Sequence, residues 1–257
     1  MPRAVSLACR LRAPRVMTEA AIGSGAAAGR LVARPHPPRS SGRVGLQRPA
    51  LAGKRDALVW VPDSYTPQLA SPLIVLLHGA GGNAQGGLRL IGSLAEEAGV
   101  ILVAPASQGV SWDVLYGGYG PDVETVDHAL HFVLERYAVD PRRLGIGGFS
   151  DGASYALSLG LTNGDLFSHI VAFSPGFAAP EAHRDKPAIF VSHGIRDEVL
   201  PIGPCSRRLV PLLRDLGYQV TYREFDGPHT VPVEVAREAL AWLGAQANGS
   251  KPRSTAA

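Results

Sequence analysis

The sequence is poor in the features that build disulfide frameworks, membrane spans and metal centres. Its two cysteines in 257 residues, Cys9 and Cys205, make no disulfide framework, so we expect a reducing compartment and a cytoplasmic location. No stretch approaches the roughly 18 apolar residues of a membrane span, which argues against stable membrane insertion. No pair of histidines has a metal-ligand spacing such as H-E-x-x-H, and we expect neither a metal nor another cofactor.

Acidic residues are nearly absent from residues 1–48. This segment holds nine arginines and one acid, Glu19, which leaves a net charge of about −5 on the rest of the chain. The basic balance therefore belongs to the leader, and we expect no nucleic-acid binding. Arg10 interrupts the first apolar stretch too early for a secretory signal, although the composition also resembles a transit peptide. We expect a disordered Arg/Pro-rich leader, or an upstream extension before a true start at Met17.

Beyond the leader, apolar runs and helical periodicities alternate along the chain. With 46% hydrophobic residues the chain can bury a sizeable core, and we expect one domain over residues 49–247 and a flexible tail over 248–257. The expected strands are 57–61, 73–77, 100–103, 144–149, 170–173, 188–191 and 220–225, and the expected helices are 84–98, 123–137, 151–160, 204–216 and 233–243. Pro211 should kink or shorten its helix. This alternation predicts an α/β fold with a mostly parallel sheet flanked by helices, and chemistry at the carboxyl ends of the strands.

The sequence G-F-S-D-G at residues 148–152 follows an expected strand and opens an expected helix. This G-x-S-x-G pattern is typical of a nucleophile elbow, a strained turn that exposes a serine hydroxyl. Glycines stand two residues before and two after the serine because the strand and helix backbones come very close there. We therefore predict that Ser150 is a catalytic nucleophile. The alternative is a tight glycine-rich turn in which Ser150 only caps a helix.

The sequence H-G-A-G-G-N at residues 78–83 follows the buried run 73–77. Acyl transfer builds negative charge on a carbonyl oxygen, and backbone N–H groups aimed at that oxygen stabilise it. We expect one such donor from Ala80 and the other from Asp151, the residue after the nucleophile. The alternative, a phosphate-binding loop, lacks the required lysine and Ser/Thr.

Two further loops supply an acid and a base. Asp197 and Glu198 follow the strand 188–191, and we predict that Asp197 is the carboxylate that orients a catalytic histidine. His229 is the only histidine downstream of that acid, which completes the order Ser, Asp, His. His78 and His193 flank the same loops and are expected to brace them by hydrogen bonding.

The connection 106–121 is long and carries Trp112, Tyr116 and Tyr119. We expect these aromatics to wall an acyl or aryl pocket, the alternative being a surface loop whose aromatics pack on the core. Only twelve residues, 176–187, lie between Pro175 and the strand expected to begin at residue 188, and this segment is too short for a helical cap. An open, shallow site without a large cap domain is therefore expected.

Together these motifs resemble the phospholipase/carboxylesterase family of α/β-hydrolases, which includes acyl-protein thioesterases and small bacterial carboxylesterases. The resemblance runs from about residue 56 to residue 246. It implies an α/β-hydrolase fold, a triad of Ser150, Asp197 and His229, and oxyanion donors at Ala80 and Asp151. The implied activity is that of a serine carboxylesterase acting on soluble short-to-medium esters through an acyl-enzyme, with a small-molecule ester as partner.

One departure from the family pattern leaves the acyl group open. Thioesterases of this family often have Gln followed by two glycines after the nucleophile, whereas here Asp151 is followed by Gly152 and Ala153. The stretch from Trp112 to Tyr119 also resembles polyester depolymerases and feruloyl esterases. The alternatives are therefore a feruloyl esterase or polyester depolymerase, an acyl thioesterase, or a serine peptidase. The oligomeric state is left open.

Overall fold

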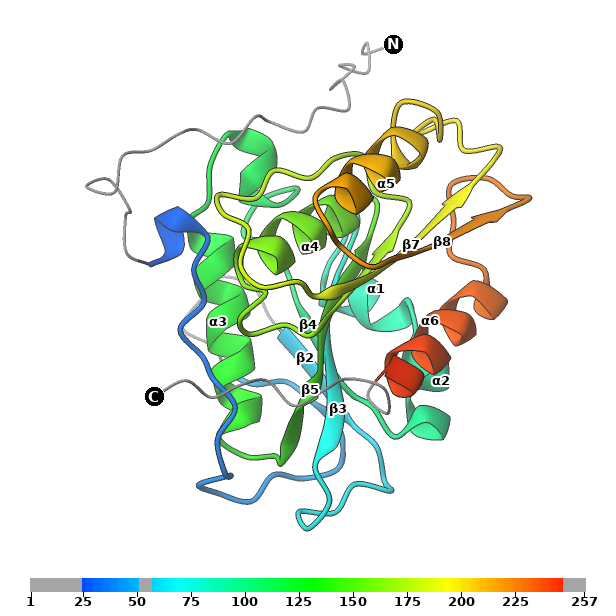
Figure 1. Ribbon diagram of the computed structural model, residues 1–257. Helices are drawn as coiled ribbons and strands as arrows, with labels where there is room; N and C mark the ends of the chain where they lie inside the picture. Colours follow the sequence, from blue (N-terminus) through cyan, green and yellow to red (C-terminus); the bar gives the residue numbers. More distant parts are fainter. Residues whose placement is uncertain (1–24, 51–56, 247–257) are drawn as a thin grey trace.

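A central eight-stranded sheet organises the chain in a computed structural model that describes residues 25–50 and 57–246 (Figure 1). The strand order is β1-β2-β4-β3-β5-β6-β7-β8. Strand β2 runs antiparallel to both neighbours and all other pairs are parallel, so the α/β-hydrolase fold expected from the sequence is present. The strands are β1 Gly45–Gln47, β2 Ala57–Val61, β3 Ser71–Leu77, β4 Ile101–Pro105, β5 Val139–Phe149, β6 His169–Phe173, β7 Ala188–Gly194 and β8 Val220–Phe225.

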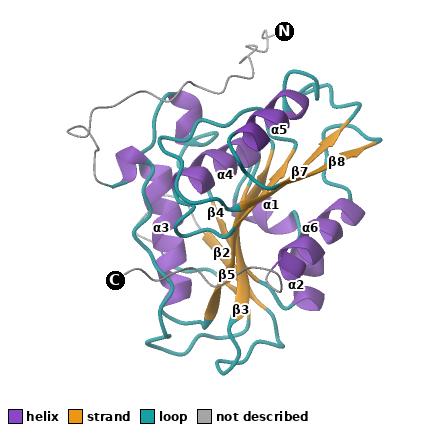
Figure 2. Cartoon of the chain, viewed as in Figure 1, coloured by secondary structure: helices purple, strands orange, loops and turns teal. Residues whose placement is uncertain are grey.

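Helices cover both faces of this sheet (Figure 2). On one face lie α3 Pro121–Leu134, α4 Asp151–Thr162 and α5 Ser206–Asp215, and on the other α1 Ala84–Arg89, α2 Gly92–Ala98 and α6 Val233–Gln246. The apolar side chains accordingly form two cores, one on each face of the sheet. No helix of the described residues is long and apolar enough to cross a membrane.

Two of the expected helices differ from the structure. The expected helix 84–98 is divided at Leu90 and Ile91 into α1 and α2. Glycine is a poor helix former, and Gly86 and Gly87 lie inside α1, where Gly87 lets the helix approach the Leu76 backbone. The helix expected over 204–216 is α5, Ser206–Asp215, which is shorter at both ends, and Pro211 lies inside it without ending it.

Residues 25–50 pack on the domain, which corrects the expected leader boundary at residue 48. Leu31 and Ala33 are each only 2% exposed in the core, and strand β1 extends the sheet beside β2. The guanidinium of Arg30 donates two hydrogen bonds of 2.8 Å to the carboxylate of Asp165. We call residues 25–34 the N-terminal strap. The expected tail 248–257 and residues 1–24 of the leader lie outside the described residues.

The carboxyl ends of neighbouring strands meet at one edge of the sheet. Leu77 of β3 pairs with Gly148 of β5, and the ends of β6, β7 and β8 follow in order on the other side. Every loop that the sequence analysis singled out begins at this edge. The parallel sheet therefore brings together motifs that lie up to 150 residues apart in the sequence, at 78–83, 148–152, 193–198 and 227–229.

Candidate active site

Ser150 stands at a strained turn between β5 and α4. Its backbone has φ 58° and ψ −120°, a left-handed conformation that costs a non-glycine residue about 1–3 kcal/mol. Its N–H donates to the Phe173 carbonyl at 2.9 Å, which ties the turn to β6. A Cβ on Gly148 would lie 2.5 Å from the Gly152 backbone, so only glycine fits there. The turn thus has the shape that the G-x-S-x-G pattern predicts.

The loop after β3 lies directly beside this turn. A Cβ on Gly79 would stand 3.4 Å from the Ser150 Cβ, so the residue before the expected oxyanion donor Ala80 lies against the nucleophile. Gly81 has φ 69° and donates its N–H to the Val110 carbonyl at 2.7 Å. On the other side of Ser150, Asp151 is the first residue of α4. The first N–H groups of a helix have no partner within it, so the Asp151 amide is suited to an anionic oxygen.

Of the two neighbouring acids, Asp197 is buried and contacts His229, whereas Glu198 is exposed. The Nδ1 atom of His229 lies 2.5 Å from Oδ2 of Asp197. The Asp197 side chain is fully buried, and its Oδ1 accepts hydrogen bonds from the N–H groups of Val199 and Leu200 at 3.0 and 2.8 Å. A carboxylate held this way keeps the proton of His229 on Nδ1 and leaves Nε2 free to accept one.

His229 also lies against the elbow. Its ring centroid is 4.5 Å from that of Phe149, the residue before Ser150. The structure therefore brings the three residues predicted as a triad, Ser150, Asp197 and His229, to loops at one edge of the sheet. Their catalytic roles stay predictions until they are tested.

A second buried histidine touches the same carboxylate. The Nε2–H of His193 donates to the Leu200 carbonyl at 2.7 Å and lies 3.2 Å from Oδ2 of Asp197. Its Nδ1 accepts from the Ser206 hydroxyl at 2.7 Å. Burial lowers the pKa of His193, which keeps the ring neutral as this pattern of bonds requires. The expected bracing role is confirmed, and the direct contact with Asp197 is a finding that the four-residue spacing in S-H-G-I-R-D could have suggested.

His78 braces the loop that it opens, as expected. Its Nδ1–H donates to the Gly79 carbonyl at 2.7 Å, and its Nε2 accepts from the Ser107 N–H at 3.0 Å. The ring is 1% exposed. The first bond holds the loop after β3 in place, and the second connects it to the loop after β4.

The three aromatic residues expected to wall a pocket lie in different environments. Trp112 is fully buried, stacked on Tyr155 with centroids 5.0 Å apart, and its Nε1–H donates to the His78 carbonyl at 2.9 Å. Tyr119 is buried too, and its hydroxyl donates to the Ala179 carbonyl at 2.9 Å. Tyr116 alone is exposed, at 70%. The pocket interpretation is therefore corrected for Trp112 and Tyr119, whose side chains pack in the core.

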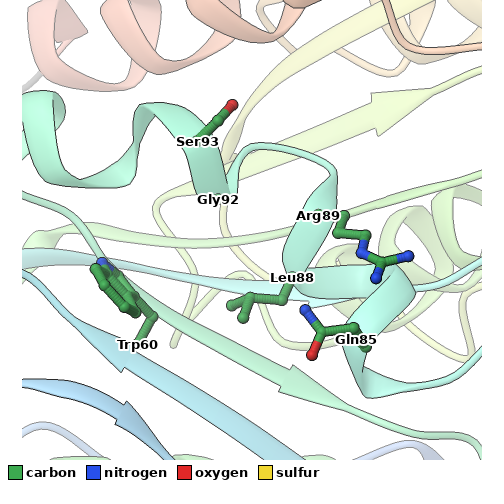
Figure 3. Close-up of a pocket in the computed structure, with 6 residues that line it drawn as sticks. All are labelled: Trp60, Gln85, Leu88, Arg89, Gly92 and Ser93. Carbon is green, nitrogen blue, oxygen red and sulfur yellow. The ribbon is translucent and has the colours of Figure 1, made fainter.

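A separate cavity of about 240 Å³ opens between β2 and the helices α1 and α2 (Figure 3). None of the residues predicted to act in catalysis lines it. Its lining consists of Trp60, Gln85, Leu88, Arg89, Gly92 and Ser93. Over the parts of the chain that the structure describes, no group of three or more His, Cys, Asp or Glu residues could hold a metal ion.

In sequence and in fold, this chain is similar to known esterases. Residues 123–243, which include Ser150, Asp197 and His229, match the family model described as Phospholipase/Carboxylesterase. "Probable feruloyl esterase C" of Aspergillus oryzae is 28% identical over 157 residues, covering 57% of this chain and 56% of that protein. This chain thus spans about half the length of that curated relative.

Two solved structures share the fold. The crystal structure of esterase PE8 has a TM-score of 0.58 at 25% sequence identity and covers 79% of this chain and 99% of that one. A truncated carbohydrate esterase from gut microbiota has a TM-score of 0.66 at 16% identity, covering 84% of this chain and all of that one.

Proposed function

Because this chain belongs to the phospholipase/carboxylesterase family of α/β-hydrolases, we propose that it is a serine carboxylesterase that hydrolyses soluble short-to-medium esters through an acyl-enzyme. One observation carries the proposal. A strained serine at the elbow stands beside a histidine whose Nδ1 is held by a fully buried carboxylate. This is the arrangement that activates a serine hydroxyl for attack on a carbonyl.

Acylation begins with proton transfer from Ser150 to Nε2 of His229 as the hydroxyl oxygen attacks the ester carbonyl. Asp197 holds the imidazole in the correct tautomer and stabilises the imidazolium that forms. The imidazolium then gives its proton to the departing alkoxide, and the alcohol leaves an acyl group on Ser150.

The backbone amides of Ala80 and Asp151 receive the negative charge of the carbonyl oxygen in both steps. A fixed N–H donor of this kind is worth about 10²–10³-fold in kcat. In deacylation His229 takes a proton from water as the water oxygen attacks the acyl carbonyl. The imidazolium then returns the proton to the Ser150 oxygen as the bond between that oxygen and the acyl carbon breaks, which releases the acid product and regenerates the Ser150 hydroxyl. No cofactor enters this sequence of steps.

Aryl esters are the second candidate substrate. The relative named as a probable feruloyl esterase supports this candidate, and so does the exposed Tyr116 on the loop after β4. Exposed apolar side chains on loops at both sides of the elbow, Val110 and Val199 at 66% each, fit an uncharged acyl or aryl group. The segment 176–187 contains no helix, which supports an open site without interfacial activation.

The proposal is tested by a fluorophosphonate probe and a panel of p-nitrophenyl esters of rising acyl length, run beside a thioester and a hydroxycinnamate ester. We expect one label per chain, on Ser150, and the highest kcat/KM with a short or medium ester. Ser150→Ala should remove labelling and lower kcat by roughly 10⁴–10⁶-fold with the melting temperature retained. Absence of labelling in the wild type, or a tenth of its activity in the variant, would overturn the assignment.

A further inference from the structure

Three consecutive residues on the loop after β4 each bind a different part of the expected oxyanion hole. The carbonyl of Val110 accepts from the N–H of Gly81 at 2.7 Å. The hydroxyl of Ser111 donates to Oδ2 of Asp151 at 2.7 Å. The indole N–H of Trp112 donates to the carbonyl of His78 at 2.9 Å. We call residues 110–112 the oxyanion clamp.

The clamp spans the two donors that must act together. The first donor, Ala80, lies in the sequence between His78 and Gly81. The clamp therefore holds the loop on both sides of Ala80, through the bond from Trp112 to His78 and the bond from Gly81 to Val110. The third hydrogen bond of the clamp, from Ser111, holds the side chain of Asp151, whose backbone amide is the second expected donor. These donors come from segments about 70 residues apart in the sequence, and the clamp connects them from a third segment.

Two of the three residues of the clamp, Ser111 and Trp112, are buried and held by packing. Ser111 is 5% exposed, and Trp112 is packed between the His78 and Tyr155 rings at centroid distances of 4.9 and 5.0 Å. Directly after it, Asp113 and Asp122 bind each other's backbone: the Asp113 N–H donates to Oδ2 of Asp122 at 2.7 Å, and the Asp122 N–H donates to Oδ2 of Asp113 at 3.0 Å. This reciprocal pair closes the loop and fixes where residues 110–112 stand.

Asp151 needs such a restraint because of its charge. A carboxylate at the start of a helix can fold back and bind the free N–H groups of that helix, including the one needed for the oxyanion. A negative charge close to a developing oxyanion also opposes it. The hydrogen bond from Ser111 holds the Asp151 carboxylate away from the N–H groups at the start of α4, so the Asp151 amide can bind the oxyanion.

We propose that Ser111 and Trp112 are positioning residues for the oxyanion hole, Ser111 through the Asp151 carboxylate and Trp112 through the His78 carbonyl. The inference rests on the proposed esterase function. Because the oxyanion exists only during reaction, loss of either bond lowers kcat and leaves KM nearly unchanged.

The test measures kcat, KM and the fluorophosphonate labelling rate of Ser111→Ala and Trp112→Phe with a soluble p-nitrophenyl ester. Phenylalanine keeps an aromatic ring beside Tyr155 and removes the N–H donor together with the second ring of the indole, a loss of volume that the Trp242→Phe control below shares. We expect kcat to fall about tenfold in each variant with KM within twofold. Labelling should slow by a similar factor and still reach one label per chain, because the nucleophile stays intact.

Two matched controls separate positioning from general damage. Trp242→Phe removes another buried indole N–H, one without a hydrogen-bond partner among the described residues, and Ser93→Ala removes an exposed hydroxyl. Both should keep wild-type kcat. Incomplete labelling of Ser111→Ala and Trp112→Phe, or equal losses in their controls, would overturn the proposal.

A double-mutant cycle tests the role assigned to the Asp151 charge. Ser111→Ala should cost about tenfold in the wild-type background and less than twofold in the Asp151→Asn background, since the charge to be restrained is gone. Equal losses in both backgrounds would contradict it. Failure of the proposed esterase function is distinguishable, because wild-type Ser150 would then not be labelled at all.

Discussion

On one side of Ser150 the loops after β7 and β8 bring together charged and imidazole side chains, whereas on the other side the loops after β3 and β4 present backbone amides. The residues of the acid–base side lie close together in the sequence: His193 stands four residues before Asp197, and His229 follows 32 residues after it. The amide side is supported over a longer path. Trp112 stacks on Tyr155, Tyr155 packs near Tyr119 at 6.0 Å, and the Tyr119 ring lies against Gly29 of the N-terminal strap.

This difference predicts which substitutions on each side should lower kcat, and by how much. A side chain that transfers or holds a proton cannot be replaced by a neighbour, so single substitutions on the acid–base side should have large effects on kcat. Every residue except proline supplies a backbone N–H, so the amide side depends mainly on where the backbone lies and less on which side chains it carries. Its losses should be smaller and spread over the clamp, the aromatic stack and the strap.

Asp197→Asn tests the acid–base side most directly. The imidazole would lose its tautomer control, and we expect kcat to fall on the order of 10⁴-fold in steady-state assays. The neighbouring Glu198→Gln is the matched control and should cost less than twofold, since Glu198 is exposed. The opposite pattern would show that the wrong carboxylate was chosen.

Deletion of residues 1–34 tests the far end of the amide side. Compared with deletion of residues 1–24, it removes the buried Leu31 and Ala33, the ion pair from Arg30, and hydrogen bonds from the strap backbone to Asn163 and Asp127. We expect a loss of about 3–5 kcal/mol in the free energy of unfolding. By calorimetry this would lower the melting temperature on the order of 10 °C. Equal stability of the two deletions would mean that the strap is dispensable.

His193→Ala should lower kcat by roughly 10–100-fold, because Asp197 would lose one of its partners and the Leu200 carbonyl its donor. His193→Gln carries an N–H group near the position of Nε2, and we expect it to recover most of this loss. If both variants lose stability and neither loses kcat, His193 supports only the fold.

Asp165→Asn should have the smallest effect. The guanidinium of Arg30 lowers the pKa of Asp165 from its ordinary value of 3.8 to about 2, so the pair stabilises the fold above about pH 4 and this contribution disappears as pH falls towards 2. The carboxylate is partly exposed, which reduces the expected gain to about 1 kcal/mol at pH 7. Urea unfolding at pH 7 and pH 3 should show the difference between variant and wild type shrinking at the lower pH. A difference independent of pH would show that charge is not its cause.

Local patterns predicted the elbow well because a strand, a tight turn and a helix follow one another directly in the sequence. The alternation of strands and helices predicted that Ser150, Asp197 and His229 lie after the carboxyl ends of parallel strands, at one edge of the sheet, and the structure places them after β5, β7 and β8. Trp112 was misjudged because an aromatic residue on a glycine-rich loop has the same local signal whether it lines a pocket or enters the core. The carbonyl that binds it, that of His78, is 34 residues away.

The sequence by itself determined the alternation of strands and helices and the order of the residues that carry charge and nucleophilicity, because these depend on periodicity and on side chains that stand within one loop. Only the tertiary structure decided that residues 25–48 belong to the domain, since Arg30 meets Asp165 across 135 residues and composition alone made the segment look solvated. It also decided that residues 110–112 form hydrogen bonds with both segments predicted to supply the oxyanion donors, through Gly81 and His78 on one side and Asp151 on the other. The motifs name the two expected donors, Ala80 and Asp151, but the alignment of their amides exists only once three distant segments have packed together.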